Sequence, residues 1–332
     1  MKEQDYIEIQ KQFLQKIEDL IPKETSLVFE LSELLGLSTD SVYRRMRGET
    51  LMTIDEIIKI CNNYNVSFDA FSKAETGLVT FRYSDPQPTF ASFIEYLTRM
   101  YNDLVRIASF PESKIVYAAE DIPIFYHYGF SEIASFKFFY WLKSVSNLPE
   151  LQAAQYDPAL LDPEIKQIAE KIFGLYIRIP SVEIWTENTV IGAVKQIEYY
   201  WDSGFFKNSE DALKVCGSLE AEITNISKMA EMSSKEMNEK ENYQLYHSDV
   251  EIANNCVLVD LGNHKAVYLG HLTFYTLSTS NLIYGNKTAE WLETLIKKST
   301  LISGVSEKQR IRFFKKAFRS IEDLKEKIRK DT

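Results

Sequence analysis

The chain has 332 residues, with 38 Lys and Arg against 48 Asp and Glu, and a net charge of -10 at pH 7. At roughly 100–200 residues per domain, this length predicts two or three domains. An apolar fraction of 45% with 26% charged residues is ordinary for a folded protein and excludes wholesale disorder. The acidic balance argues against a protein that coats nucleic acid non-specifically, but it permits a small local basic surface.

Cysteine usage and the N-terminal sequence indicate the compartment. Cys61, Cys216 and Cys256 lie far apart and form no CxxC pair, so neither a zinc ribbon nor a secreted disulfide scaffold is predicted. The first residues are charged from Lys2 onward and lack the apolar stretch of a signal peptide. No uninterrupted run of about 18 apolar residues occurs. We therefore expect a cytoplasmic protein without a membrane contact.

Residues 6–71 show the spacing of five short helices. In the first, Ile9, Phe13, Ile17 and Leu20 form one apolar stripe. The second spans about 26–35 and ends at Gly36, and the third runs through Arg47 and ends at Gly48. The fourth begins near Thr53, and we expect one inward face made of Ile54, Ile57, Ile58 and Cys61. A fifth helix is predicted over 67–71.

The remaining chain is predicted to form a larger domain. Residues 76–88 are a predicted linker, because Pro86 and Pro88 can continue neither a helix nor a central strand. Residues 89–240 have mainly helical patterns, with a candidate strand over 113–119. The segment 255–279 alternates with a period of two and contains the turn signal Gly262-Asn263. Two helices follow, over about 287–300 and 306–329.

These elements predict a mainly α protein with two domains. The first is a five-helix domain over residues 1–75, and the second is a predominantly helical α+β domain over residues 89–332 with a small C-terminal sheet. A subdivision of the second domain near residue 241 is left open.

One concentrated basic cluster carries functional information. Arg44, Arg45 and Arg47 fall within four residues, on a helix that follows the tight turn Gly36-Leu37-Ser38. Two helices joined by so short a turn cross steeply, as in a helix-turn-helix. On a helical wheel Val42 and Met46 share one face and Arg44 points almost opposite. This helix therefore buries two apolar side chains and presents polar ones outward.

The stretch 31–60, with Gly36, Val42, Arg47-Gly48 and Ile57, resembles a helix-turn-helix of the lambda-repressor-like (XRE) class. Tyr43 to Thr50, followed by Asp55-Glu56-Ile57, is similar to the Tyr-Arg-Arg regulators of Bacteroidetes, akin to the BetR type. Residues 299–303, with Glu307, Arg310, Phe313 and Phe314, also resemble these regulators. One departure is Arg45, because many lambda-repressor-like domains bury an aliphatic residue at that position.

The resemblance and the wheel together predict the DNA-binding residues. A major groove admits one α-helix. Arg binds the acceptor atoms of guanine there, and a short hydroxyl side chain can bind either a donor or an acceptor on a base edge. We expect Ser41 and Arg44 to reach base edges, Arg45 and Arg47 to hold phosphates, and Asp40 to cap the helix or accept from a cytosine amino group. The predicted DNA-binding set is Ser38, Thr39, Asp40, Ser41, Tyr43, Arg44, Arg45 and Arg47. A structural helix hairpin with a solvated basic face is the alternative.

Two further segments allow both a functional and a structural interpretation. Residues 124–142 hold nine aromatic side chains, which form either a core helix or the wall of a ligand pocket. The candidate ligand-binding residues there are Tyr126, His127, Tyr128, Tyr140 and Trp141. The basic helix near the C-terminus either lies along phosphate or membrane, or buries a stripe formed by Ile311, Phe314, Phe318 and Ile321. The periodicity favours the buried stripe.

No motif predicts catalysis, a metal or a cofactor. The four histidines have no HExxH spacing, and the chain lacks a GxxxxGK[ST] loop, a GxGxxG turn and a GxSxG elbow. We therefore expect a sequence-specific transcription regulator rather than an enzyme. Its predicted partners are double-stranded DNA, a second copy of the chain, and a small-molecule or protein effector at the larger domain. The alternative is a protein-protein interaction module that uses the N-terminal helices without DNA.

Overall fold

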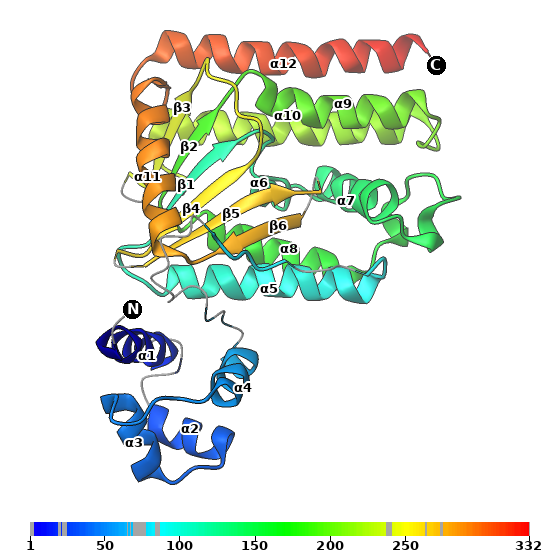
Figure 1. Ribbon diagram of the computed structural model, residues 1–332. Helices are drawn as coiled ribbons and strands as arrows, with labels where there is room; N and C mark the ends of the chain where they lie inside the picture. The colour runs from blue at the N-terminus through cyan, green and yellow to red at the C-terminus, as the bar shows by residue number, and fades with distance from the viewer. Residues whose placement is uncertain are drawn as a thin grey trace. The chain divides into compact units, whose positions relative to one another are not determined.

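The computed structural model describes residues 3–18, 21, 25–64, 66, 68, 78–83, 87–236, 241–262, 264–272 and 275–331. The protein is mainly helical and contains one small mixed sheet (Figure 1). Contacts divide the chain into two compact units, Met1–Phe81 and Arg82–Thr332. The division falls inside the predicted linker, although Arg82 already pairs with Ser278 at the edge of the sheet.

The first unit contains α1 (Glu3–Glu18), α2 (Leu27–Leu35), α3 (Thr39–Arg47) and α4 (Ile54–Tyr64), drawn in blue in Figure 1. These four helices agree with the sequence prediction. The fifth predicted helix, over 67–71, lies outside the described residues except for Phe68. The Phe68 ring meets Phe13 of α1 edge-on, with 5.2 Å between the ring centroids.

A small core holds the helices of this unit together. Its buried side chains come from all four described helices: Phe13, Leu14, Ile17, Leu27, Val28, Leu31, Val42 and Ile60. The predicted inward face of α4 is partly wrong, because Ile54 and Ile58 are 78% and 53% exposed. Glu56 is buried on the inner side of α4. Residues two positions away lie about 160° around the helix axis, so Ile54 and Ile58 turn to solvent.

The second unit is built on a seven-stranded sheet with the order β6-β5-β4-β1-β2-β3-β7. The strands are β1 (Lys114–Ala119), β2 (Ser181–Trp185), β3 (Tyr243–His247), β4 (Cys256–Asp260), β5 (Lys265–His271), β6 (Tyr275–Thr279) and β7 (Thr300–Leu301). Strands β1, β2 and β3 are parallel, whereas β4, β5 and β6 form an antiparallel series beside β1, and β7 is antiparallel to β3.

The predicted strand at 113–119 and the β4–β5 hairpin are confirmed, but β2 and β3 were not predicted. The sheet joins strands from both sides of residue 241, so it is not confined to the C-terminal part of the chain as predicted. Strand β2 reads Ser-Val-Glu-Ile-Trp and is buried throughout. Its burial on both faces removes the polar alternation by which an exposed strand is recognised.

Helices cover both faces of the sheet. They are α5 (Phe90–Ala108), α6 (Ile124–His127), α7 (Ser131–Tyr140), α8 (Pro163–Tyr176), α9 (Asn188–Asp202), α10 (Ser209–Met232), α11 (Leu282–Lys297) and α12 (Glu307–Lys330). A π-helical turn, Trp141–Val145, continues α7. Helices α9, α10 and α12 pack side by side, as do α5 and α8 (Figure 1).

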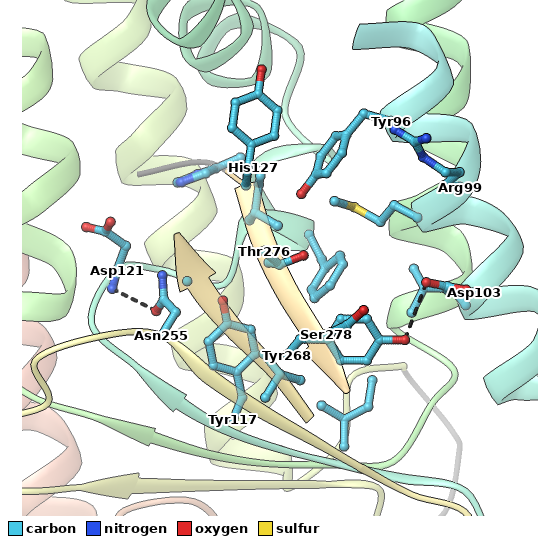
Figure 2. Close-up of a pocket in the computed structure, with 18 of the residues that line it drawn as sticks. Tyr96, Arg99, Asp103, Tyr117, Asp121, His127, Asn255, Tyr268, Thr276 and Ser278 are labelled. Carbon is cyan, nitrogen blue, oxygen red and sulfur yellow. Dashed lines mark hydrogen bonds between the residues drawn. The ribbon is translucent and has the colours of Figure 1, made fainter. Parts of the chain in front are cut away.

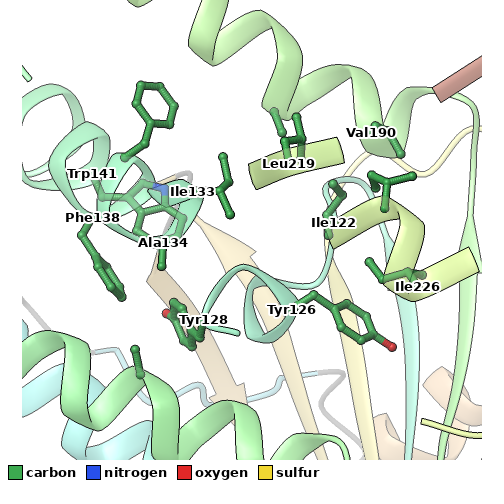
Figure 3. Close-up of a cluster of buried hydrophobic side chains, with 14 of the residues drawn as sticks. Ile122, Tyr126, Tyr128, Ile133, Ala134, Phe138, Trp141, Val190, Leu219 and Ile226 are labelled. Atoms are coloured by element: carbon green, nitrogen blue, oxygen red, sulfur yellow. The ribbon is translucent and has the colours of Figure 1, made fainter. Parts of the chain in front are cut away.

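Side-chain alternation along β1 and β2 separates two cores. Ala118 and Ile184 face a small cluster that includes Leu292 and Leu295 of α11. Tyr117 and Trp185 face the main core, which α5 to α10 and α12 complete. Figure 3 shows part of this core, where Tyr126, Tyr128, Phe138 and Trp141 lie among aliphatic side chains such as Ile133 and Leu219.

Helix α12 packs on the main core through Phe313, Phe314, Ala317, Ile321, Leu324 and Ile328. The buried stripe favoured by the periodicity is therefore present, but it is rotated from the predicted one. Ile311 is 56% exposed, and Arg310 points inward instead, where its Nη1 donates to the carbonyls of Ile302 and Val305 at 3.1 and 3.0 Å.

Candidate functional site

The α2–α3 pair has a three-residue connection, Gly36-Leu37-Ser38. Gly36 has φ +66°, in the left-handed region that favours glycine, and it ends α2. The N–H of Leu37 then donates to the carbonyl of Ser32 at 3.1 Å. Ser38 returns to an extended conformation and begins α3. The turn that the sequence predicted thus exists between two helices of nine residues each.

Ser38 organises the start of α3. Its Oγ accepts from the N–H of Ser41 at 3.3 Å and lies 2.9 Å from the hydroxyl of Ser41. Ser38 is therefore the N-cap. Capping was one of the two roles that the sequence predicted for Asp40. Thr39 and Asp40 are exposed. The polar groups of this first turn are held in place while their outer sides remain open to a partner.

The inner face of α3 is confirmed, since Val42 is buried and Met46 packs against the core. Its outer face presents Tyr43, which is 48% exposed, together with Arg44 and Arg47. Glu49, just beyond the helix, pairs with both arginines. Its Oε1 is 2.6 Å from Arg47 Nε, and its Oε2 is 3.8 Å from Arg44 Nε. The hydrogen bond from Arg47 lowers the pKa of Glu49.

Arg45 has a different position from its neighbours. Its Nε and Nη2 donate to the two carboxylate oxygens of Glu56 at 3.0 and 2.7 Å, and its Nη1 donates to the carbonyl of Ser41 at 3.1 Å. The two side chains are only 14% and 9% exposed. The expectation that Arg45 holds a phosphate does not fit this geometry, because all three nitrogens of the guanidinium group donate within the unit. Arg45 is therefore not assigned to the proposed DNA interface.

Glu56 also caps its own helix, since its Oε2 accepts from the N–H of Thr53 at 3.0 Å. Burial opposes the ionisation of Glu56. The hydrogen bonds from Arg45 and from the Thr53 N–H outweigh this effect, so the pKa of Glu56 is lowered. The Arg45–Glu56 pair thereby fixes α3 against the start of α4.

Gln10 of α1 fixes the other end of α3. Its Nε2 donates to the carbonyls of Arg45 and Thr50 at 2.8 and 2.9 Å, and its Oε1 accepts from the N–H of Met52 at 2.7 Å. Gly48 ends α3 with φ +77°. A Cβ on Gly48 would come within 2.4 Å of Cγ2 of Ile7. Helix α3 is therefore held by α1 on one side and by α4 on the other, with its basic face outward.

The second unit contains a cavity of about 160 Å³, which lies between the sheet and α5 (Figure 2). His127 and Trp141, two of the predicted ligand-binding residues, line it. Tyr126, Tyr128 and Tyr140 do not line it. Tyr128 stacks on Phe138, with 5.3 Å between the ring centroids, and Tyr140 packs beside Tyr200.

Tyr126 belongs to a buried polar network around Glu183 of β2. The Glu183 carboxylate accepts from Tyr126 Oη at 2.7 Å, Tyr176 Oη at 2.6 Å and Trp185 Nε1 at 3.0 Å. Tyr243 Oη and Ser181 Oγ also donate to it, both at 3.2 Å. A carboxylate with five donors is satisfied without a ligand, and we interpret this network as structural.

The sequence did not predict the other polar side chains of the cavity. Tyr117 comes from β1, Lys137 from α7 and Gln196 from α9, while Asp121 and Asn255 lie in loops. They come from five separate segments of the sequence, so no spacing pattern marks them as one group. Only the pairing of β1 with β4 brings Tyr117 near Asn255.

Within the described ranges, no group of three or more His, Cys, Asp or Glu side chains is placed to hold a metal ion. No helix of the described chain is both long and apolar enough to cross a membrane. Comparison with models of protein families, with curated proteins and with solved structures gave no match.

Proposed function

We propose that the chain is a sequence-specific DNA-binding transcription regulator, a binding protein rather than an enzyme, in which α3 enters the major groove. The observation that carries the proposal is the outer face of α3. Thr39, Asp40, Tyr43, Arg44 and Arg47 are all exposed on a short helix whose other side is fixed to the core. A major groove about 12 Å wide accepts such a helix, and Arg is the residue most often used on guanine.

The contacts follow from position on the helix. Ser41 and Arg44 are assigned to base edges, and Arg47 is assigned to phosphate, together with the polar groups of the first turn around Ser38. Glu49 holds Arg44 and Arg47 in the free protein. A phosphate oxygen replaces Glu49 as the partner of Arg47 when DNA binds, because both groups are oxygen anions that suit a guanidinium.

We further propose that the regulator acts as a homodimer. A helix of nine residues reads too few base pairs for useful selectivity in a genome, and paired half-sites one DNA turn apart correct this. We place the main dimer contact on the larger unit, where Ile283 and Trp291 of α11 are 69% and 47% exposed. Exposed apolar side chains of this size are typical of protein contacts.

Exposed apolar residues on the smaller unit favour a second candidate function. Phe29, Ile54 and Ile58 are 68%, 78% and 53% exposed, which suits a protein-protein interaction module that uses these helices without DNA.

Selection of bound duplexes from random DNA separates the two candidates. DNA binding predicts enrichment of one sequence, and a variant with Arg44→Ala and Arg47→Ala should lose that enrichment. Recovery of no enriched sequence by the intact protein, with α2 to α4 still protected from hydrogen exchange, would favour the interaction module.

A further inference from the structure

The cavity of the second unit has one wall formed by the sheet and another formed by α5 (Figure 2). Its sides are largely aliphatic and aromatic, with Met100, Leu104, Ile107, Val257 and Trp141 among them. The volume of about 160 Å³ is close to the ~150 Å³ of a cavity that holds benzene. A ligand body of the size of one six-membered ring therefore fits it.

Polar side chains gather at one part of this apolar space. His127 is 1% exposed, and its Nδ1 lies 2.9 Å from Oε2 of the fully buried Glu222. Among the described residues, His127 Nε2 has no hydrogen-bond partner. This contact leaves Nε2 for another group, and when Nδ1 carries the proton and donates to Glu222, Nε2 is an acceptor. A buried polar atom without a partner is costly unless a ligand or water satisfies it.

Two hydrogen-bond donors line the same cavity as His127. Lys137 is 3% exposed, and its Nζ donates to Gln196 Oε1 at 2.7 Å, which leaves other N–H groups of the ammonium for a ligand. Figure 2 shows the hydroxyl of Tyr117 pointing from β1 into the space between Asn255 and Thr276. Burial raises the pKa of Tyr117, so this hydroxyl keeps its proton and can donate.

Asn255 adds an amide group to the same region. Its Oδ1 accepts from the backbone N–H groups of Glu120 and Asp121 at 2.9 and 3.3 Å. This orientation is set by the loop after β1, and it leaves the Nδ2 group of Asn255 as a donor. The side chains around His127 thus supply mainly donors, which suits a ligand group that is rich in acceptors.

Asp121 adds an acidic side chain to this part of the cavity. Its carboxylate packs closely against Gly192 of α9, where a Cβ would lie 2.2 Å from Oδ1. The position of this oxygen is therefore set by the helix backbone. Burial lowers the pKa of Lys137 and the nearby Asp121 acts in the opposite direction, so Asp121 provides the test of which charge the cavity prefers.

We propose that this cavity binds a small carboxylic acid with an apolar body about one ring in size, and that Lys137 and Tyr117 receive the carboxylate. The apolar walls take up the body of the ligand. A carboxylate supplies acceptor atoms for these donors, and charge-assisted hydrogen bonds at a buried site discriminate strongly against a neutral isostere. Binding of the acid requires only the second unit. A role of the acid as an effector of DNA binding rests on the proposed function.

Calorimetry on the full chain without DNA tests the proposal, with phenylacetate, phenylacetamide and phenethylamine as probes of nearly equal shape. Phenylacetate should bind, and the amide and the amine should each bind at least about 10-fold more weakly. The proposal is overturned if the amine binds most tightly, if the three probes bind equally, or if phenylacetate does not bind at millimolar concentration.

Variants locate the binding group. Lys137→Met should weaken phenylacetate binding about 10-fold or more, and Tyr117→Phe, which removes only a hydroxyl, should weaken it several-fold. Asp121→Asn should retain or strengthen binding, because it removes a like charge. Lys195→Met, at an exposed position of α9, is the matched control and should have no effect. Loss of binding in Asp121→Asn together with full binding in Tyr117→Phe would contradict the assignment. No DNA is present, so failure of this site and failure of DNA binding are observed separately.

Discussion

Replacement of Arg45 by methionine should destabilise the smaller unit rather than remove a DNA contact. The change deletes the two bonds to Glu56 at 3.0 and 2.7 Å and the bond to the Ser41 carbonyl at 3.1 Å. Breaking a fully buried ion pair costs about 3–5 kcal/mol. Glu56 is 9% exposed and keeps the N–H of Thr53, so we expect a smaller loss of about 2–3 kcal/mol.

Hydrogen exchange of peptides from α2 to α4 measures this loss in the intact protein. A loss of about 1.4 kcal/mol in stability corresponds to a tenfold faster exchange. The exchange of protected amides should therefore accelerate about 30- to 150-fold. Lys59→Met is the matched control, since it removes a cation that is 52% exposed on the same helix, and it should change exchange little. A double variant with Arg45→Met and Glu56→Met should regain much of the protection, because no unpaired carboxylate remains.

The same pair gives a pH dependence with a defined sign. The folded-state pKa of Glu56 is lowered from 4.5, so its contribution to stability is present above this pH and is lost as the pH falls through the folded value. Exchange rates in wild type and in Arg45→Met should therefore converge in acid. Wild-type protection in Arg45→Met at neutral pH, combined with a salt slope of DNA binding reduced by about one unit, would refute the structural role and restore Arg45 as a phosphate contact.

Five other outcomes are expected. Arg47→Ala should weaken binding to all duplexes similarly and flatten the salt slope by about one unit, whereas Arg44→Ala should cost about 1–3 kcal/mol of discrimination at one base pair, both measured by fluorescence anisotropy. Glu49→Gln should raise DNA affinity, because it releases both arginines and removes a negative charge near phosphate; unchanged or lower affinity would count against the assigned face. Burial lowers the pKa of Lys235 from 10.5 to about 7, so the unfolded chain binds more protons between these values. The stability of the larger unit, followed by tryptophan fluorescence, should then rise with pH in that window by up to about 1.4 kcal/mol per unit, and Lys235→Met should abolish the rise. Residues 89–332 should sediment as a dimer. Sedimentation as a monomer would contradict the placement of the dimer contact on the larger unit.

The sequence predicted the smaller unit well because its signals are local. Gly36 and Gly48 both adopt the positive φ that a glycine after a helical run indicates, and Val42 is buried as the wheel requires. The error at Ile54 and Ile58 arose because Ile60 was left out of the predicted inward face. Ile57, Ile60, Cys61 and Tyr64 follow helical spacing and pack on the core, which turns Ile54 and Ile58 to solvent.

The larger unit was less predictable because its main features depend on contacts between distant segments. Strand β2 contains Glu183 in its centre, and a carboxylate there argues against a buried strand until its five donors are assembled from other segments. Likewise, His127 and Trp141 were found through the aromatic segment, but Tyr117 and Lys137 join them only when the sheet and α7 meet. The cavity is a product of tertiary structure, whereas the α2–α3 turn can be inferred from neighbouring residues.

The most direct test of the central claim is the affinity of the intact protein for a duplex selected from random DNA, measured against a scrambled duplex at several salt concentrations. Tight, salt-dependent binding that prefers the selected duplex is expected. Arg44→Ala should remove the preference while α2 to α4 stay protected from exchange. Equal affinity of wild type for both duplexes, or an undiminished preference in Arg44→Ala, would contradict the assignment of α3 as the helix that reads DNA.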